Sequence, residues 1–110
     1  MSTEPDDANR SRLAGSANVR TRGYREQLDK LPPQIRGLAD AAFQLFSREP
    51  RHPSLRLHEL SNTRAGRHRA GSRSVSITRG YRAIYKVDGD TNVWYWIGSH
   101  NDYENFTGRK

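Results

Sequence analysis

Residues 74–97 read SVSITRGYRAIYKVDGDTNVWYWI, and this stretch decides the fold. Val75 and Ile77 alternate with small polar residues, and residues 81–87 place an apolar side chain at nearly every second position. This period of two is typical of β-strands. Asp88-Gly89-Asp90 forms the turn of a hairpin, and residues 93–97 are apolar on both faces, as in a central strand that is covered on both sides. The stretch therefore predicts three strands joined by tight turns.

Two helices are predicted before this stretch. Tyr24, Leu28 and Leu31 lie on one face of a short helix that begins near Arg22 and ends at Pro32. Residues 33–48 carry a second apolar stripe, formed by Ile35, Leu38, Ala39, Ala42, Phe43 and Phe46. Because the connection between the two helices is short, we expect them to pack as an antiparallel pair.

A further strand is expected after Pro53, where Leu55 and Leu57 alternate with polar residues. Together, these elements predict an α+β domain in which the N-terminal helix pair packs on one face of a roughly four-stranded, mainly antiparallel sheet. Residues 1–21 are poor in apolar side chains and show no periodicity, so we expect a flexible tail there. Residues 22–110 are then expected to form a single domain.

The composition excludes several classes of protein. The sequence has no Cys, which excludes disulfide scaffolds, iron–sulfur clusters and thiol nucleophiles. No apolar run is long enough to span a membrane, and the chain opens with polar and acidic residues, so a cytoplasmic protein is expected. His52, His58, His68 and His100 lack the spacing of zinc ligands, so no metal or other cofactor is expected.

Basic residues are concentrated in one part of the chain. The 19 Lys and Arg residues exceed the 12 Asp and Glu residues, giving a formal net charge of +7. Residues 1–21 contain three basic and three acidic side chains, so the excess lies in residues 22–110. Residues 64–82 hold six Arg and no acidic residue. Such a stretch is either a solvated surface or a site for a polyanion such as nucleic acid, whose phosphates suit the planar guanidinium group.

Three side chains supply the groups that metal-free RNA cleavage requires. His100 and Tyr103 lie in an expected loop, residues 98–103, that directly follows the central strand. Arg82 lies in a strand on the face opposite Tyr81 and Tyr85. His exchanges protons near neutral pH, and Arg stabilises the negative charge that develops on phosphorus. The alternatives are an ordinary surface His and a surface Arg that pairs with a carboxylate. Trp94 and Trp96 are expected to pack in the core, with base stacking on the sheet as the alternative.

Three segments resemble the RelE/ParE superfamily of bacterial toxins. They are residues 50–60 (PRHPSLRLHEL), residues 74–85 (SVSITRGYRAIY) and residues 96–103 (WIGSHNDY), and the resemblance covers roughly residues 22–106. It implies a small α+β domain with a cognate antitoxin. The RelE, YoeB, YafQ and HigB branches of this superfamily cut mRNA in the ribosomal A site without a metal ion.

The resemblance also implies roles for individual residues. Arg82 matches the strand Arg that contacts the scissile phosphate, and His100 falls where YafQ-like members place a catalytic His. Tyr103 corresponds approximately to a C-terminal aromatic residue that stacks or assists proton transfer. Ser74 and Ser76 stand where RelE has a pair of Lys, so His100 would have to act as the base.

The sequence thus predicts a ribosome-dependent endoribonuclease toxin whose partners are mRNA, the ribosome and an acidic antitoxin. Five further basic residues are expected to bind RNA: Arg64, Arg67, Arg69, Arg73 and Arg79. The alternatives are a ParE-like inhibitor of DNA gyrase and an inactive domain of the same fold that only binds nucleic acid.

Overall fold

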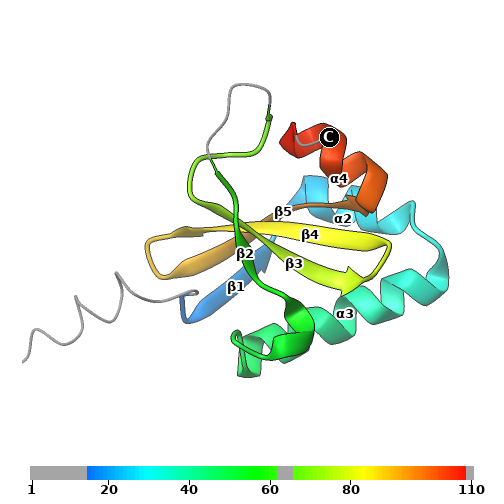
Figure 1. The fold of residues 1–110 in the computed structure, drawn as a ribbon. Helices are drawn as coiled ribbons and strands as arrows, with labels where there is room; N and C mark the ends of the chain where they lie inside the picture. The colour runs from blue at the N-terminus through cyan, green and yellow to red at the C-terminus, as the bar shows by residue number, and fades with distance from the viewer. Residues whose placement is uncertain (1–14, 62–65, 109–110) are drawn as a thin grey trace, which may run out of the picture.

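The computed structural model describes residues 15–61 and 66–108 (Figure 1). The elements are β1 (Ala17–Arg20), α2 (Arg22–Asp29), α3 (Pro33–Arg48), the 3-10 turn η1 (Pro53–Leu55), β2 (His58–Glu59), β3 (Ser72–Thr78), β4 (Tyr81–Asp88), β5 (Thr91–Ser99) and α4 (His100–Thr107). The strands form one sheet in the order β1-β5-β4-β3-β2. β1 pairs parallel with β5, and the other neighbours are antiparallel. The predicted α+β class is confirmed, with a mixed five-stranded sheet where about four strands were expected.

The first strand lies in the segment that was predicted to be a flexible tail. Ala17–Arg20 pairs with β5 from Thr91 to Trp94. The buried Asn92 side chain fixes the entry to this strand, because its Oδ1 accepts from the Gly15 amide at 2.6 Å and its Nδ2 donates to the Gly15 carbonyl at 3.1 Å. For residues 17–20 the tail prediction is therefore wrong. Residues 1–14 lie outside the described residues.

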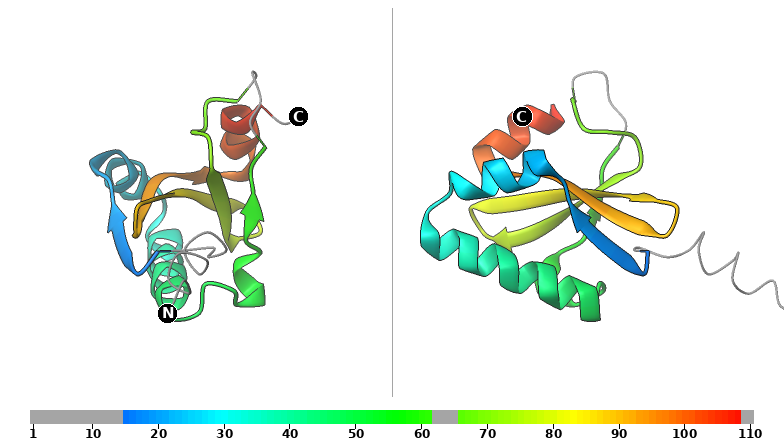
Figure 2. Two further views of the ribbon diagram at one scale, coloured as in Figure 1. Left: turned by 90° about the vertical axis from the view of Figure 1, so that its left-hand side faces the viewer. Right: turned by 180° about the vertical axis from the view of Figure 1, so that it is seen from behind.

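The sheet lies between α3 on one face and α4 on the other (Figure 2). Each face carries its own apolar cluster. The larger cluster is formed by α2, α3 and one face of the sheet, and includes Tyr24, Leu28, Ala39, Ala42, Phe46, Val75, Ala83, Tyr85 and Trp94. The smaller cluster lies under α4 on the other face and contains Leu60, Ile84, Trp96 and Tyr103. Helices α2 and α3 contribute to one core on one face, as predicted, but α4 covers part of the face that was expected to be open.

Helix α2 begins with a side-chain cap, and its far end lies beside β5. The Oγ1 of Thr21 accepts from the Tyr24 amide at 3.1 Å. Further along, Gln27 Oε1 accepts from the backbone amide of Ile97 at 3.0 Å. Because β1 pairs with β5 only as far as Trp94, this glutamine satisfies an amide that the strand leaves unpaired.

A β-bulge in β5 places the side chains of Trp94 and Trp96 on opposite faces of the sheet. Ile84 pairs with Trp96 and the next residue, Tyr85, pairs with Trp94, so Tyr95 is the extra residue. Trp94 therefore stacks on Tyr85 in the larger cluster, with ring centroids 5.6 Å apart. Trp96 stacks on Phe106 on the opposite face, at 5.1 Å. The prediction that both tryptophans pack in the core is confirmed. Without the bulge, strict alternation would put both side chains on the same face.

Two local predictions differ from the structure. Pro53–Leu55 forms a 3-10 turn, where the sequence predicted a strand, and β2 is only His58–Glu59. The sequence also predicted a loop at residues 98–103, yet α4 begins at His100 and is capped by Ser99, whose Oγ accepts from the Asp102 amide at 3.1 Å. Helix α4 is short and Tyr103 and Phe106 are its only large apolar side chains, so the apolar stripe that reveals a helix in a sequence is weak.

Candidate active site

Arg82 stands on the α4 side of the sheet, as the strand alternation predicted. Its Nη1 donates to the Oγ of Ser74 on the neighbouring strand at 3.0 Å. The guanidinium carbon lies 5.2 Å from the centroid of the Tyr103 ring. The Arg82 side chain is half-buried and the Ser74 side chain is fully buried. Arg82 is thus held between a strand hydroxyl and an aromatic ring, and its position is fixed before any anion arrives.

Helix α4 brings His100 and Tyr103 beside this arginine. The His100 amide donates to the Gly80 carbonyl at 2.7 Å, which ties the first turn of α4 to the β3–β4 turn. The imidazole stacks on the Tyr103 ring with centroids 6.0 Å apart and an interplanar angle of 26°. Tyr103 is 3% exposed and belongs to the smaller core cluster. The structure therefore brings all three predicted catalytic residues together, with the Tyr103 ring next to both Arg82 and His100.

The His100 imidazole also contacts a carboxylate. Its Nε2 lies 3.1 Å from Oε2 of Glu104, one helical turn further along α4. Both side chains are partly exposed. The i,i+4 spacing places them on the same face of the helix.

Two adjoining hollows meet at these residues. One has a volume of about 370 Å³ and is lined by Arg56, Leu57, His58, Arg82, His100, Tyr103 and Glu104. The other, of about 420 Å³, is lined by Ser54, Arg56, Ser76, Ile77, Thr78, Arg79, Arg82 and His100. Both hollows share Arg56, Arg82 and His100. Among the described residues, those that line the second hollow include hydroxyl groups and three Arg side chains but no carboxylate, which suits a phosphate.

Sequence reasoning missed three residues of this site. Arg56 ends the 3-10 turn in the left-handed region, with φ 43°, and His58 begins β2. Glu104 reaches the site only because residues 100–107 are helical. The left-handed backbone conformation costs energy for an L-residue such as Arg. Residues held in this conformation are often found at functional sites. The helical spacing of His100 and Glu104 was a usable signal, but it required recognising the helix first.

The predicted RNA-binding arginines are dispersed. Arg79 lines the second hollow. Arg67 and Arg69 lie over aromatic rings instead, with Arg67 5.7 Å from the Phe106 centroid and Arg69 4.9 Å from the Tyr95 centroid. Arg73 alternates with the buried Ser72 and Ser74, so it faces the α3 side, where its charge acts on Tyr85. Arg64 lies outside the described residues.

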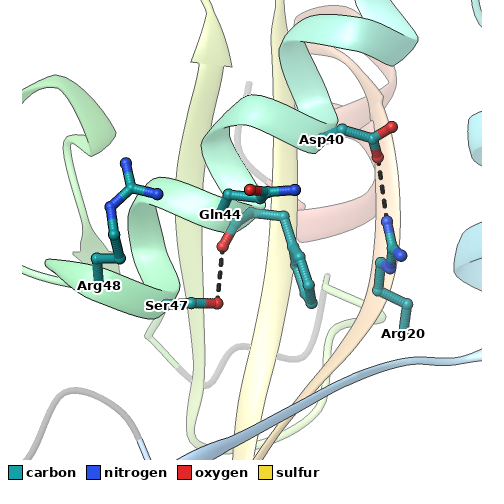
Figure 3. A pocket seen from close by; sticks show the side chains of 6 residues that line it. Arg20, Asp40, Gln44, Ser47 and Arg48 are labelled. Atoms are coloured by element: carbon teal, nitrogen blue, oxygen red, sulfur yellow. Dashed lines mark hydrogen bonds and ion pairs between the residues drawn. The ribbon is translucent and has the colours of Figure 1, made fainter.

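A third hollow, of about 450 Å³, lies between β1 and α3 (Figure 3). Arg20 bridges its two walls, because its Nη1 lies 3.1 Å from Oδ1 of Asp40 and its guanidinium lies 4.5 Å from the Phe43 ring. In the part of the chain that the structure describes, its one carboxylate is already paired with Arg20, and no imidazole lines it. It therefore lacks the acid–base groups that are present around His100.

The described residues contain neither a cluster of metal ligands nor a membrane-spanning helix. No group of three or more His, Asp or Glu side chains within residues 15–61 and 66–108 is arranged to hold a metal ion. None of the helices in those two segments is long and apolar enough to cross a membrane.

Comparisons with known proteins identify the family to which the chain belongs. The model of the ParE-like toxin domain family matches residues 33–105. None of the proteins with curated descriptions matches the sequence. The chain belongs to the ParE-like toxin domain family and is a toxin of the RelE/ParE superfamily.

Solved structures of toxins share this fold. The RelBE2 toxin–antitoxin complex of Mycobacterium tuberculosis contains a chain with 28% identity and a TM-score of 0.57, with 79% of this chain and all of that chain covered. YafQ of E. coli gives 13% identity and a TM-score of 0.60, with 78% and 94% covered. The RelB–RelE complex of Methanococcus jannaschii gives 12% identity and a TM-score of 0.56, with 80% and 96% covered.

Proposed function

We propose that this protein is an endoribonuclease toxin that cuts mRNA on the ribosome without a metal ion. The observation that carries the proposal is the convergence of Arg82, His100 and Tyr103 on one hollow. These side chains supply a fixed cation, a base that works near neutral pH and a hydroxyl. A phosphodiester cleavage that uses the neighbouring 2′-hydroxyl as nucleophile requires these groups and no others.

In the proposed reaction, the 2′-oxygen of the substrate forms a bond to phosphorus while the bond from phosphorus to the 5′-oxygen breaks. His100 takes the proton of the 2′-hydroxyl, and the Tyr103 hydroxyl gives a proton to the departing 5′-oxygen. The products are a 2′,3′-cyclic phosphate and a 5′-hydroxyl. His100 is assigned as the base because tyrosine hydroxyls ordinarily release their protons only near pH ~10.

Arg82 stabilises the extra negative charge on phosphorus in the transition state. Its contacts with Ser74 and Tyr103 fix the guanidinium before RNA binds, so little reorganisation accompanies the reaction. Arg56 and Arg79 line the second hollow and hold a neighbouring phosphate of the chain. Arg67 and Arg69 do not line either of these hollows and are proposed to contact RNA further away.

An acidic antitoxin is the expected protein partner. The M. tuberculosis and M. jannaschii neighbours were solved as toxin–antitoxin complexes. The formal net charge of +7 on this chain favours an acidic partner, because complementary charge speeds association and selects the partner. Both proteins are proposed to act in the cytoplasm, where translating ribosomes are found.

A translation reaction with purified components tests the proposal. We expect the parent protein to cut translated mRNA, and His100→Ala and Arg82→Ala to lower the cleavage rate by about 10²- to 10³-fold. Arg25→Ala, which removes an exposed charge on α2, serves as the control and should cleave like the parent. Undiminished cleavage by both site variants would overturn the assignment.

The second candidate function is inhibition of DNA gyrase, which the ParE-like family model favours. It predicts intact mRNA and loss of supercoiling when gyrase, relaxed plasmid and the protein are mixed. Running the supercoiling and translation reactions with one protein preparation separates the two activities. RNA binding that weakens steeply with salt, without cleavage and without an effect on gyrase, would indicate an inactive nucleic-acid-binding domain.

A further inference from the structure

The contact between His100 and Glu104 determines which ring nitrogen is available for chemistry. An ionised carboxylate only accepts hydrogen bonds, so the Nε2 that lies 3.1 Å from Glu104 Oε2 must carry a hydrogen. In the neutral imidazole, the proton on Nε2 leaves Nδ1 unprotonated. The nitrogen that can accept a proton from a substrate is therefore Nδ1.

The position of the ring is fixed by several independent contacts. Ser99 caps the first turn of α4, and the His100 backbone donates to Gly80 at 2.7 Å. The ring face lies on Tyr103, which is buried in the smaller core cluster. The backbone hydrogen bonds and the stacking on Tyr103 do not prevent the imidazole from rotating about the bond between Cβ and Cγ. The contact with Glu104 fixes this rotation.

The charged groups around the imidazole divide into two sets. Arg56 and Arg82 line both hollows with His100, and Arg79 lines one of them. Among the residues that the structure describes, Glu104 is the one carboxylate that lines either hollow. When the ring accepts a proton at Nδ1, it becomes a cation among arginines, and the Glu104 carboxylate offsets that charge.

We propose that Glu104 is a positioning residue that holds His100 in the Nε2-protonated form and stabilises the imidazolium formed during the reaction. The proposal rests on the endoribonuclease function proposed above and extends it to a residue outside the predicted catalytic set. Glu104 contacts no reacting atom. It acts through His100, as a carboxylate orients the histidine of a hydrolytic triad.

Two substitutions separate orientation from charge. Glu104→Gln keeps a carbonyl oxygen that accepts from Nε2 but removes the negative charge, and Glu104→Ala removes both. In single-turnover cleavage of translated mRNA, we expect kcat to fall about 10-fold for Glu104→Gln and about 10²-fold for Glu104→Ala, with KM unchanged. Glu26→Gln is the matched control, because Glu26 also forms an i,i+4 contact at 3.1 Å, with Arg22 on α2, and should leave kcat unchanged.

Nitrogen NMR of the imidazole rings measures the tautomer of His100. This tautomer would not respond to Glu104 if Glu104 had only a structural role. At a pH where the ring is neutral, we expect His100 to be protonated on Nε2 in the parent and in Glu104→Gln, and to populate the Nδ1-protonated form in Glu104→Ala. A His100→Gln variant identifies the His100 signals. Circular dichroism shows whether each variant is folded, and the exposure of both side chains makes misfolding unexpected.

Each outcome decides the proposal. A fall in kcat together with the change of tautomer in Glu104→Ala supports it. A parent ring protonated on Nδ1, a tautomer that does not respond to Glu104→Ala, or an altered tautomer with unchanged kcat overturns it. If the parent protein cleaves no mRNA, the endoribonuclease function fails, while the tautomer measurement still tests the pairing of the two side chains.

Discussion

At the scale of single residues, Arg82 and His100 were predictable because their positions follow from local patterns. Arg82 lies within an otherwise apolar strand, so the period of two predicts which face of the sheet its side chain occupies. The hydrogen bond from Arg82 to Ser74 shows that the side chain lies on that face. His100 follows the last strand directly, so it had to lie at one end of the sheet. Arg56, His58 and Glu104 were missed, because their place in the site depends on a left-handed turn and on a helix that the sequence did not reveal.

Tyr103 combines a chemical role with a structural one, and two substitutions distinguish them. Tyr103→Phe keeps the ring between Arg82 and His100 and removes only the hydroxyl, so we expect kcat to fall about 10²-fold with unchanged stability. Tyr103→Ala empties part of the smaller core cluster and should cost about 3–5 kcal/mol of unfolding free energy. Urea unfolding beside mRNA cleavage measures both effects. Full activity of Tyr103→Phe would remove the hydroxyl from the mechanism.

At the scale of elements, β1 and α4 are the strand and the α-helix that the sequence did not predict. β1 has only four residues, too few for their alternation to stand out in the sequence, and its place is set by pairing with β5, more than 70 residues away. α4 contains two Asn and a Thr among its eight residues, which are weak helix formers, and it forms through the Ser99 cap and the packing of Tyr103 and Phe106. Both elements depend on tertiary contacts more than on local preference.

Asn92 is expected to control whether β1 joins the sheet. Asn92→Ala leaves the Gly15 amide and carbonyl without their partner and removes the contact with Asn18 at 2.9 Å, so we expect a loss of about 2–3 kcal/mol. Urea unfolding measures this loss, and hydrogen exchange should show faster exchange in residues 17–20. Asn105→Ala, on the exposed surface of α4, is the control. Equal stability of the two variants would show that β1 is held by its strand pairing alone.

At the scale of the whole molecule, the sheet carries an apolar core on one face and both a smaller core and the candidate active site on the other. The low apolar fraction of 33% was compatible with one core, yet the structure has two clusters. The basic stretch of residues 64–82 is likewise divided between the two faces, because strand alternation turns Arg73 away from Arg82. Charge that is contiguous in the sequence is therefore not contiguous on the surface.

Two tyrosines in the larger cluster predict how the stability of the fold depends on pH. Burial raises the pKa of Tyr24 and of Tyr85 well above the ordinary value. Above pH ~10 the unfolded chain loses these protons while the folded chain keeps them, so the unfolding free energy should fall as the pH rises, by up to about 1.4 kcal/mol per pH unit for each tyrosine. Below that pH, these two groups should leave stability unchanged.

Urea unfolding at pH 8, 9.5 and 11 measures this slope. Tyr85→Phe keeps the ring in the core and removes one of the two titrating groups, so the slope above pH 10 should decrease to about half. A parent protein whose unfolding free energy stays constant between pH 9.5 and 11 would contradict the prediction.

The sequence by itself determined the elements whose signal is local and periodic. These are the three long strands, the helical stripes of α2 and α3, the face of Arg82 and the position of His100 at the end of a strand. Only the tertiary structure decided the pairing of β1, the bulge at Tyr95 that parts Trp94 from Trp96, and the folding of α4. It also decided which side chains meet His100, since Arg56, His58 and Glu104 come from three separate elements. The physical reason is that alternation and amphipathicity act between near neighbours in the chain, whereas these features depend on contacts between distant segments.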